Sequence, residues 1–194
     1  MNKKTIFHLA RHGQTEWNIE HRIQGQLDST LTPKGESQAL QLATLCAPLN
    51  ITQILTSSLG RALKTAQICA QQLQIEPKIE DDLKERHFGI WQGRLTPDMR
   101  SHPDYTEITS QLTDCKPEEG ESAKQILTRF ENALKRQFKN APDECYLIIT
   151  HGDVLRCFMN QFLINGQSHS GYDYKNGQLI SLSYDETTRC FSTL

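Results

Sequence analysis

The sequence predicts a layered α/β fold in which helices pack on one open sheet with parallel strands. Helix-like and strand-like segments alternate along the 194 residues, which favours a layered sheet over segregated helices and strands. Residues 5–13 and 145–152 each contain a short apolar run that is typical of a buried strand and ends in a histidine followed by glycine. A chain of this length suffices for one buried core, so we expect residues 1–194 to form a single domain.

Capping signals and periodicity define the elements between these two runs. The Thr32–Pro33 pair predicts the N-cap and first residue of a helix with a regular apolar face. Residues 53–56 are typical of a second short strand. The Ser57–Ser58 pair after that strand is expected to cap another helix. A third strand is expected at residues 78–79.

The second half of the chain contains an irregular segment, two helices and a hairpin. Residues 94–119 hold three prolines and scattered charge, so we expect an insert that lies over the sheet as a lid. Apolar residues at helical spacing predict helices over 121–138 and 154–162. Residues 178–184 and 189–193 predict a hairpin at a sheet edge.

Composition and charge limit the classes of partner. Hydrophobic side chains make up 37% of the residues and charged ones 23%, which is typical of a soluble globular protein. The formal net charge is −2, so we expect no nucleic acid and no membrane as partner, and a local basic patch would bind a small anion. The six cysteines form no C-x-x-C pair, which favours a reducing compartment. The apolar run before Arg11 is too short for a signal or membrane-spanning segment, and we expect a cytoplasmic location.

The tripeptide Arg11-His12-Gly13 carries the sharpest chemical signal. A neutral imidazole nitrogen attacks phosphorus, and the resulting phosphohistidine is labile enough for water to cleave. The adjacent guanidinium should hold His12 neutral, because a second positive charge there is disfavoured. Arginine also binds phosphoryl oxygens through two parallel hydrogen bonds. Taken alone, the tripeptide also fits a surface turn after a strand.

Three further polar residues fit a phosphate site. Arg61 lies near the start of a predicted helix, where its charge adds to backbone N–H groups; alone, it fits a solvated helix face. Asn18 can donate amide hydrogens to an anion, although it also fits a turn. Glu85 lies near aromatic residues that would raise its pKa, so that it could protonate a leaving alkoxide and later activate water. The alternative for Glu85 is a salt bridge with Arg86.

No metal and no cofactor are predicted. The adjacent carboxylates Asp81 and Asp82 lack the spaced arrangement of magnesium-dependent phosphotransfer sites. The expected positive charge at the site comes from arginine instead.

Six sequence blocks, taken in order, resemble the histidine phosphatase superfamily, in the branch with cofactor-dependent phosphoglycerate mutases and small phosphatases. They are residues 11–18 (RHGQTEWN), 31–39, 56–66, 85–93, 120–122 and 150–152. The blocks extend over nearly the whole chain. The resemblance implies a three-layer α/β/α sandwich on a mainly parallel sheet, the phosphoglycerate mutase-like fold.

The resemblance also implies roles for individual residues. It makes His12 the phosphorylated nucleophile and Glu85 the proton donor, with His151 and two arginines completing the catalytic set. Phosphoryl or substrate contacts, by side chain or backbone, are implied for a wider group: Arg11, Gly13, Asn18, Gln24, Gly25, Arg61, His151 and Gly152.

Departures from the family pattern favour a phosphatase. Gln14 stands where the family usually has glutamate. Asp153 stands where a small residue is common, and we expect it to add negative charge near the mouth and disfavour highly anionic substrates. The insert offers only Arg94, Arg100 and Lys116 as basic residues, whereas mutases cluster such residues to grip a second phosphate.

The expected function is metal-independent hydrolysis of small phosphorylated metabolites through a phosphohistidine on His12. Three alternatives stay open. They are a cofactor-dependent phosphoglycerate mutase, an α-ribazole phosphate phosphatase, and an inactive relative that only binds phosphorylated ligands. The block Glu85-Arg86-His87 is itself mutase-like.

Overall fold

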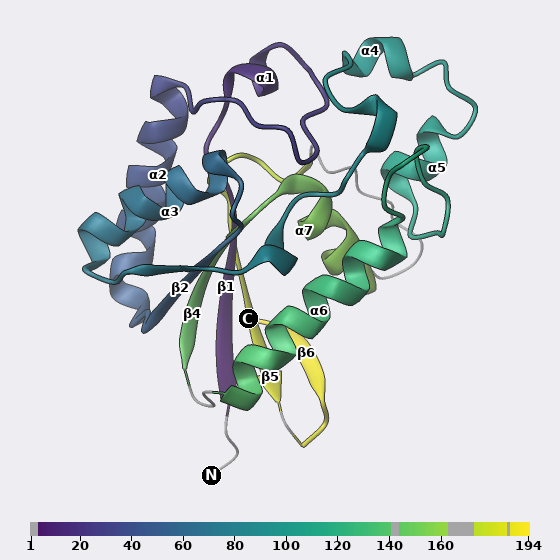
Figure 1. Ribbon diagram of the computed structural model, residues 1–194. Helices are drawn as coiled ribbons and strands as arrows, with labels where there is room; N and C mark the ends of the chain where they lie inside the picture. Colours follow the sequence, from purple (N-terminus) through teal and green to yellow (C-terminus); the bar gives the residue numbers. More distant parts are fainter. Residues whose placement is uncertain (1–3, 141–143, 163–172, 186) are drawn as a thin grey trace.

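The computed structural model describes residues 4–140, 144–162, 173–185 and 187–194. Its centre is a six-stranded sheet in the order β3-β2-β4-β1-β5-β6 (Figure 1). The first four of these strands are parallel, whereas β5 pairs antiparallel with both β1 and β6. The mainly parallel sheet and the hairpin at its edge are therefore confirmed. The strands are β1 (Lys4–Arg11), β2 (Gln53–Thr56), β3 (Pro77–Ile79), β4 (Cys145–Thr150), β5 (Leu179–Asp185) and β6 (Cys190–Thr193).

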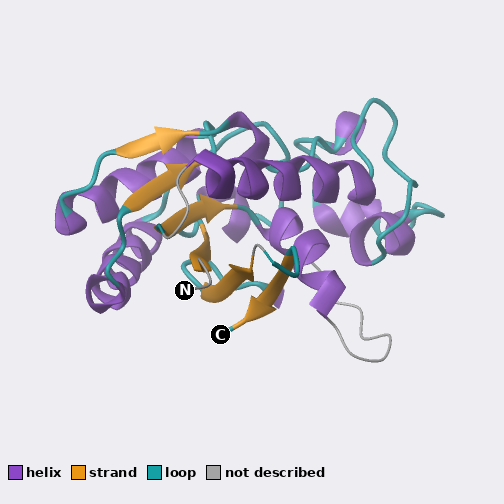
Figure 2. Ribbon diagram, turned by 90° about the horizontal axis from the view of Figure 1, so that it is seen from below, coloured by secondary structure: helices purple, strands orange, loops and turns teal. Residues whose placement is uncertain are grey.

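Helices cover both faces of the sheet, which gives the expected three layers (Figure 2). One face carries α2 (Pro33–Cys46) and α3 (Gly60–Leu73), and the other carries α6 (Ala123–Asn140) and α7 (Gly152–Met159). Three shorter helices lie in connections: α1 (Glu16–Ile19), α4 (Thr96–Met99) and α5 (Tyr105–Ser110). Short 3₁₀ turns occupy 47–49, 81–83, 89–91 and 160–162. No helix among the described residues is long and apolar enough to cross a membrane.

Alternating side chains of β4 divide the interior into two cores. Tyr146 and Ile148 point to the layer of α6 and α7, while Leu147 and Ile149 point to the layer of α2 and α3. This period of two is what a strand buried on both faces requires. Both cores therefore fix the register of β4, and with it the position of the residue that follows Thr150.

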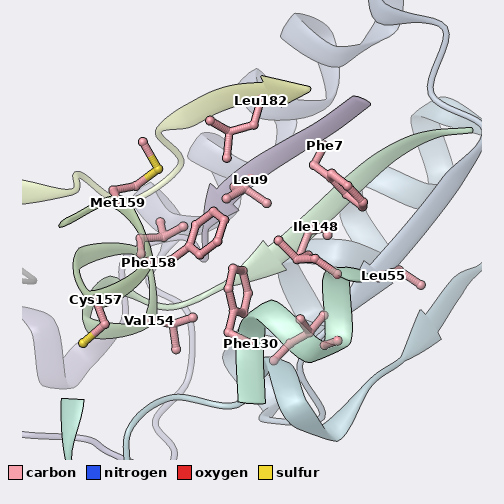
Figure 3. Close-up of a cluster of buried hydrophobic side chains, with 14 of the residues drawn as sticks. Phe7, Leu9, Leu55, Phe130, Ile148, Val154, Cys157, Phe158, Met159 and Leu182 are labelled. Atoms are coloured by element: carbon pink, nitrogen blue, oxygen red, sulfur yellow. The ribbon is translucent and has the colours of Figure 1, made fainter. Parts of the chain in front are cut away.

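Aromatic contacts hold the two helices of the first core together. Figure 3 shows Phe130 of α6 beside Phe158 of α7, and their ring centroids are 5.1 Å apart in an edge-to-face arrangement. Phe7 and Leu9 of β1 lie in the same cluster. These contacts pack α7 against α6 and the sheet.

The two predicted helix caps have different outcomes. Thr32 caps α2 as expected, since its hydroxyl oxygen accepts from the Gly35 N–H at 3.0 Å. The Ser57–Ser58 prediction for α3 is wrong, because the N-cap is Leu59 and makes no side-chain cap bond. Instead, Oδ1 of Asp28, distant in sequence, accepts from the Arg61 N–H at 3.3 Å. A loop outside the helix therefore performs the capping.

The insert at 94–119 is less irregular than its composition suggests, because it contains α4 and α5. It is joined to the body by an isolated bridge between Arg22 and Leu95 and by a small buried cluster that includes Ile23, Trp91 and Ile108. These helices are too short for hydrophobic periodicity to reveal them.

Candidate active site

The two His-Gly pairs meet at the carboxyl edge of the sheet. The parallel register of β1 and β4 places Arg11 opposite Thr150, so His12 and His151 follow at the same level. The His12 N–H donates to the Thr150 carbonyl at 3.0 Å, and the ring centroids of the two histidines are 5.2 Å apart. Open parallel sheets bind their ligands at this edge.

Hydrogen bonds fix which nitrogen of His12 is free to react. Its Nδ1 lies 2.7 Å from the Gly13 carbonyl oxygen, a contact that requires a proton on Nδ1. The Nε2 atom, 3.2 Å from Nε of Arg61, then accepts and carries the lone pair. Burial and the charges of Arg61 and Arg11 hold the pKa of His12 well below 6.5. The ring is therefore neutral at pH 7, with the lone pair on Nε2.

Arg61 is buried and held by a loop before α2. Its guanidinium donates to the carbonyl oxygens of Leu27 at 2.8 Å and Gly25 at 2.7 Å, and to the Asp28 carboxylate at 3.0 Å. These contacts orient Nε toward His12. The arginine is thus a fixed positive charge in the site, and the solvated alternative is excluded.

His151 is bound to a serine that sequence reasoning did not assign to the site. Its Nε2 lies 2.8 Å from the Ser57 hydroxyl, at the end of the neighbouring strand β2. Burial, followed by the Arg61 charge, holds the pKa of His151 well below 6.5. Its Nδ1 is buried and has no hydrogen-bond partner among the described residues.

Glu85 also lines the cavity, and its carboxylate lies in a nest of backbone N–H groups. Its carboxylate accepts from the N–H groups of Arg86 at 3.0 Å, Asp153 at 3.2 Å and Val154 at 3.3 Å. Burial, followed by the negative charge of Asp153, raises the pKa of Glu85. The alternative of a salt bridge with Arg86 is wrong, because that guanidinium pairs with Asp153.

The expectation that Asp153 adds uncompensated charge at the mouth is corrected. Its side chain is buried and contacts two buried arginines, Nε of Arg156 at 2.5 Å and Nη1 of Arg86 at 3.4 Å. Asp153 lines the cavity, but the two guanidinium groups offset the charge of its carboxylate.

The predicted residues surround one cavity of about 630 Å³. All of them line it except Gly13 and His151, whose ring lies beside His12. Arg100, but neither Arg94 nor Lys116, contributes from the insert. The cavity is also lined by apolar and aromatic side chains: Trp17, Ile23, Phe88, Pro97 and Tyr105.

Gly13 shapes the site without lining it. Its N–H donates to the Thr65 hydroxyl at 3.1 Å, so that hydrogen is not directed at a ligand. A Cβ atom at this position would lie 2.3 Å from the Gly35 carbonyl oxygen. Glycine is therefore required for close packing of the two backbones.

Asn18 and Gln24 are both oriented by neighbouring groups. Oδ1 of Asn18 accepts from the Thr15 N–H at 3.1 Å and from the Asn176 amide at 3.2 Å, which leaves its own NH₂ group for the cavity. Gln24 donates to the Thr15 hydroxyl at 2.9 Å. Asn176 is a further contributor that the sequence pattern did not reveal, because it lies 158 positions from Asn18.

Guanidinium groups supply positive charge in this cavity. Among the described residues, no group of three or more histidine, cysteine, aspartate or glutamate side chains is arranged to hold a metal ion.

Comparison with known proteins identifies the family. Residues 7–193 match the histidine phosphatase superfamily (branch 1). The probable phosphoglycerate mutase GpmB of Cronobacter sakazakii is 36% identical over 158 residues, which are 80% of this chain and 74% of that protein. The solved structure of Bacillus stearothermophilus YhfR is similar with a TM-score of 0.85 and 30% identity, covering 97% of this chain and 95% of that one.

A more distant structure shows the same fold. The mycobacterial glucosyl-3-phosphoglycerate phosphatase, solved with VO3, has a TM-score of 0.78 at 22% identity and covers 93% of this chain and 92% of its own. Phosphatases and mutases both occur among the named relatives. This chain belongs to the histidine phosphatase superfamily and has the phosphoglycerate mutase-like fold.

Proposed function

We propose that the protein is a metal-independent phosphomonoesterase that acts on small phosphorylated metabolites through a phosphohistidine on His12. The observation that carries this proposal is the neutral, buried His12 ring, whose Nε2 lies 3.2 Å from Arg61 in the same cavity as Glu85. A neutral imidazole, a fixed cation and a carboxyl group with a raised pKa therefore line one cavity.

In the first step, Nε2 of His12 forms a bond to phosphorus as the bond from phosphorus to the ester oxygen breaks. The proton of the Glu85 carboxyl group passes to that oxygen, and the alcohol leaves. Arg11 and Arg61 stabilise the charge on the phosphoryl oxygens. Nε of Arg61 transfers its hydrogen bond from Nε2 to a phosphoryl oxygen, which frees the lone pair for attack.

In the second step, water cleaves the phosphohistidine. The Glu85 carboxylate takes a proton from the water, whose oxygen bonds to phosphorus as the bond to Nε2 breaks. Inorganic phosphate leaves, and Glu85 is protonated again for the next cycle. His151, through its buried Nδ1, and the NH₂ group of Asn18 are suited to contact phosphoryl oxygens in both steps.

Two observations favour hydrolysis over the mutase alternative. The insert brings one basic residue, Arg100, to the cavity, whereas a mutase must hold a second anionic group. The cavity of about 630 Å³ is also in the range of drug-sized ligands and exceeds what a three-carbon phosphate fills. The same volume keeps α-ribazole phosphate among the candidate substrates.

The first prediction concerns turnover and its nucleophile. The protein should hydrolyse 4-nitrophenyl phosphate in EDTA, and His12→Ala should abolish turnover by removing the attacking nitrogen. Acid-labile phosphate should appear on the wild type after rapid quenching and be missing from the variant. His102→Ala, which removes an exposed histidine, is the matched control.

Each alternative has its own outcome in these assays. Interconversion of 3- and 2-phosphoglycerate faster than phosphate release would indicate a mutase. Phosphate binding without turnover would indicate an inactive relative. Hydrolysis that requires added divalent cations, or that survives in His12→Ala, would overturn the proposal.

A further inference from the structure

Asp153 places a second carboxyl group in the cavity wall beside the proposed acid. Both Asp153 and Glu85 line the cavity and are more than nine-tenths buried. The Asp153 N–H donates to Oε2 of Glu85 at 3.2 Å, so the two residues are joined through the backbone. Two buried carboxyl groups in such proximity do not both ionise easily.

Two arginines bind Asp153 and hold no salt bridge with Glu85. Nε of Arg156 donates to Asp153 at 2.5 Å, and Nη1 of Arg86 donates at 3.4 Å. No ion pair of Glu85 is present in the described part of the chain; its carboxylate accepts from backbone N–H groups. Asp153 therefore binds the two guanidinium groups whose positive charge would otherwise stabilise the ionised form of Glu85.

Backbone carbonyls fix both arginines in this arrangement. Arg86 donates to the carbonyl oxygens of Ile108 at 2.6 Å and Glu121 at 2.7 Å, and Arg156 donates to that of Gln111 at 3.3 Å. These anchors hold both guanidinium groups in place, and the Asp153 carboxylate offsets their charge. The contacts of Arg156 with Gln111 and of Arg86 with Ile108 and Asp153 join the insert to α7.

We propose that Asp153 is a positioning residue that keeps the proton on Glu85, by binding Arg86 and Arg156 and by placing a negative charge next to it. This inference rests on the proposed role of Glu85 as proton donor. It gives a role to a residue that departs from the usual family pattern.

The charges around Glu85 explain why one aspartate matters. Arg61, from α3, and the backbone N–H groups of Arg86 and Asp153 favour the ionised form, and Arg129 of α6 binds the Glu85 carbonyl oxygen. The neighbouring rings of His12 and His151 are neutral. Burial and the Asp153 charge are the two influences that raise the pKa of Glu85. Without that charge, arginines dominate the surroundings of Glu85.

The test is Asp153→Asn, which preserves shape and an oxygen acceptor for Arg156 but removes the charge. The pH profile of kcat/KM is measured with glycerol phosphate and with 4-nitrophenyl phosphate. For the alkyl ester, the basic limb should move by about one pH unit to lower pH, with a loss of about tenfold at neutral pH. The aryl ester should change by less than about twofold, because 4-nitrophenolate leaves without a proton.

Controls separate this effect from loss of structure. Asp114→Asn makes the same change on the exposed surface and should leave both profiles unchanged. If Asp153→Asn loses its near-UV circular dichroism, Arg156→Gln replaces it. Removing this cation should move the basic limb the opposite way, to higher pH. A limb that stays in place in the folded variant, or equal losses for both esters at every pH, would overturn the inference.

Failure of the inference is distinct from failure of the proposed function. Glu85→Gln should abolish the basic limb and slow the alkyl ester most. If it lowers kcat/KM equally for both esters, the role of Glu85 as acid in the first step is wrong. If Glu85→Gln behaves as expected but Asp153→Asn keeps the wild-type limb, the role of Asp153 alone is wrong.

Discussion

At the scale of single residues, His12 and Glu85 are both shifted toward their neutral forms. Burial and two arginines lower the pKa of His12, whereas burial and Asp153 raise that of Glu85. These directions suit the proposed roles of His12 as nucleophile and Glu85 as proton donor. Desolvation acts on both and favours the uncharged form of each.

These opposite shifts predict how stability depends on pH. A histidine with a lowered folded pKa contributes stability that is complete above about 6.5 and is lost as pH falls below that value. His12 and His151 therefore each decrease the free energy of unfolding by up to about 1.4 kcal/mol per pH unit on acidification. Glu85 has the opposite effect. Its raised pKa contributes stability below the pKa of the unfolded state, and this stability is lost as pH rises through the pKa of the folded state.

Urea unfolding between pH 5 and 7 measures this balance. The free energy of unfolding should fall toward pH 5 in the wild type. His12→Gln should flatten the slope, and Glu85→Gln should make it steeper. An unchanged slope in His12→Gln would show that His12 is not held neutral by the fold.

The sequence reveals the charged and imidazole side chains of the site, but it does not reveal the residues that orient them by hydrogen bonds. His12 and His151 end apolar runs, and Arg61 follows a strand, so their placement at the sheet edge was predictable. The hydroxyl of Ser57 and the amide of Asn176 act through contacts with residues 94 and 158 positions away. No local pattern encodes such contacts.

At the scale of elements, the segment before β5 braces the end of β1. The Tyr174 carbonyl oxygen accepts from Nη1 of Arg11 at 2.6 Å, and the Gly177 N–H donates to the Arg11 carbonyl at 3.0 Å. Between them, the Asn176 amide donates to the carbonyl of His12 at 3.0 Å and to Oδ1 of Asn18 at 3.2 Å. Four hydrogen bonds from three residues of this segment thus orient the proposed phosphoryl-binding groups.

Removing the Asn176 amide should weaken phosphate binding. In Asn176→Ala, the Asn18 side chain loses one of the two donors that fix its orientation. We expect an increase of about three- to tenfold in KM and in the inhibition constant of inorganic phosphate, since one hydrogen bond is worth about 1 kcal/mol. Asn132→Ala, on the exposed side of α6, is the control. A change in kcat with KM unchanged would contradict an orienting role.

The secondary structure was predictable where it is periodic or capped locally. Thr32 caps α2 because donor and acceptor lie three residues apart. Asp28 takes over the cap of α3 from a distant loop, and α4 and α5 are too short to show a period. The cap of α3 was missed because a tertiary contact supplies it, and α4 and α5 were missed because they are short.

At the scale of the whole molecule, strand register is what brings the site together. The sequence predicts two parallel strands but gives no measure of their alignment; the match of Arg11 with Thr150 follows from packing on both faces of β4. A shift by one residue would turn every side chain of β4 to the opposite core. The cavity therefore depends on both cores at once.

The same interdependence predicts that residues 94–119 unfold together with the sheet. Arg86, fully buried, donates to the carbonyl oxygens of Ile108 and Cys115 in the insert. Trp91 stacks on Tyr105 of the insert with ring centroids 6.1 Å apart. Opening the insert alone would leave the Arg86 guanidinium without these acceptors, at a cost of about 1–3 kcal/mol for each polar group left unsatisfied.

In Trp17→Phe, fluorescence reports on Trp91 alone, since the chain has two tryptophans. Its urea transition should coincide with that of far-UV circular dichroism, which follows the sheet and helices. Adding Phe130→Ala should shift both transitions to lower urea by the same amount, because this core substitution costs about 3–5 kcal/mol wherever the chain unfolds as one unit. A fluorescence transition that precedes the loss of secondary structure, or that ignores Phe130→Ala, would instead make the insert an independently opening lid over the cavity.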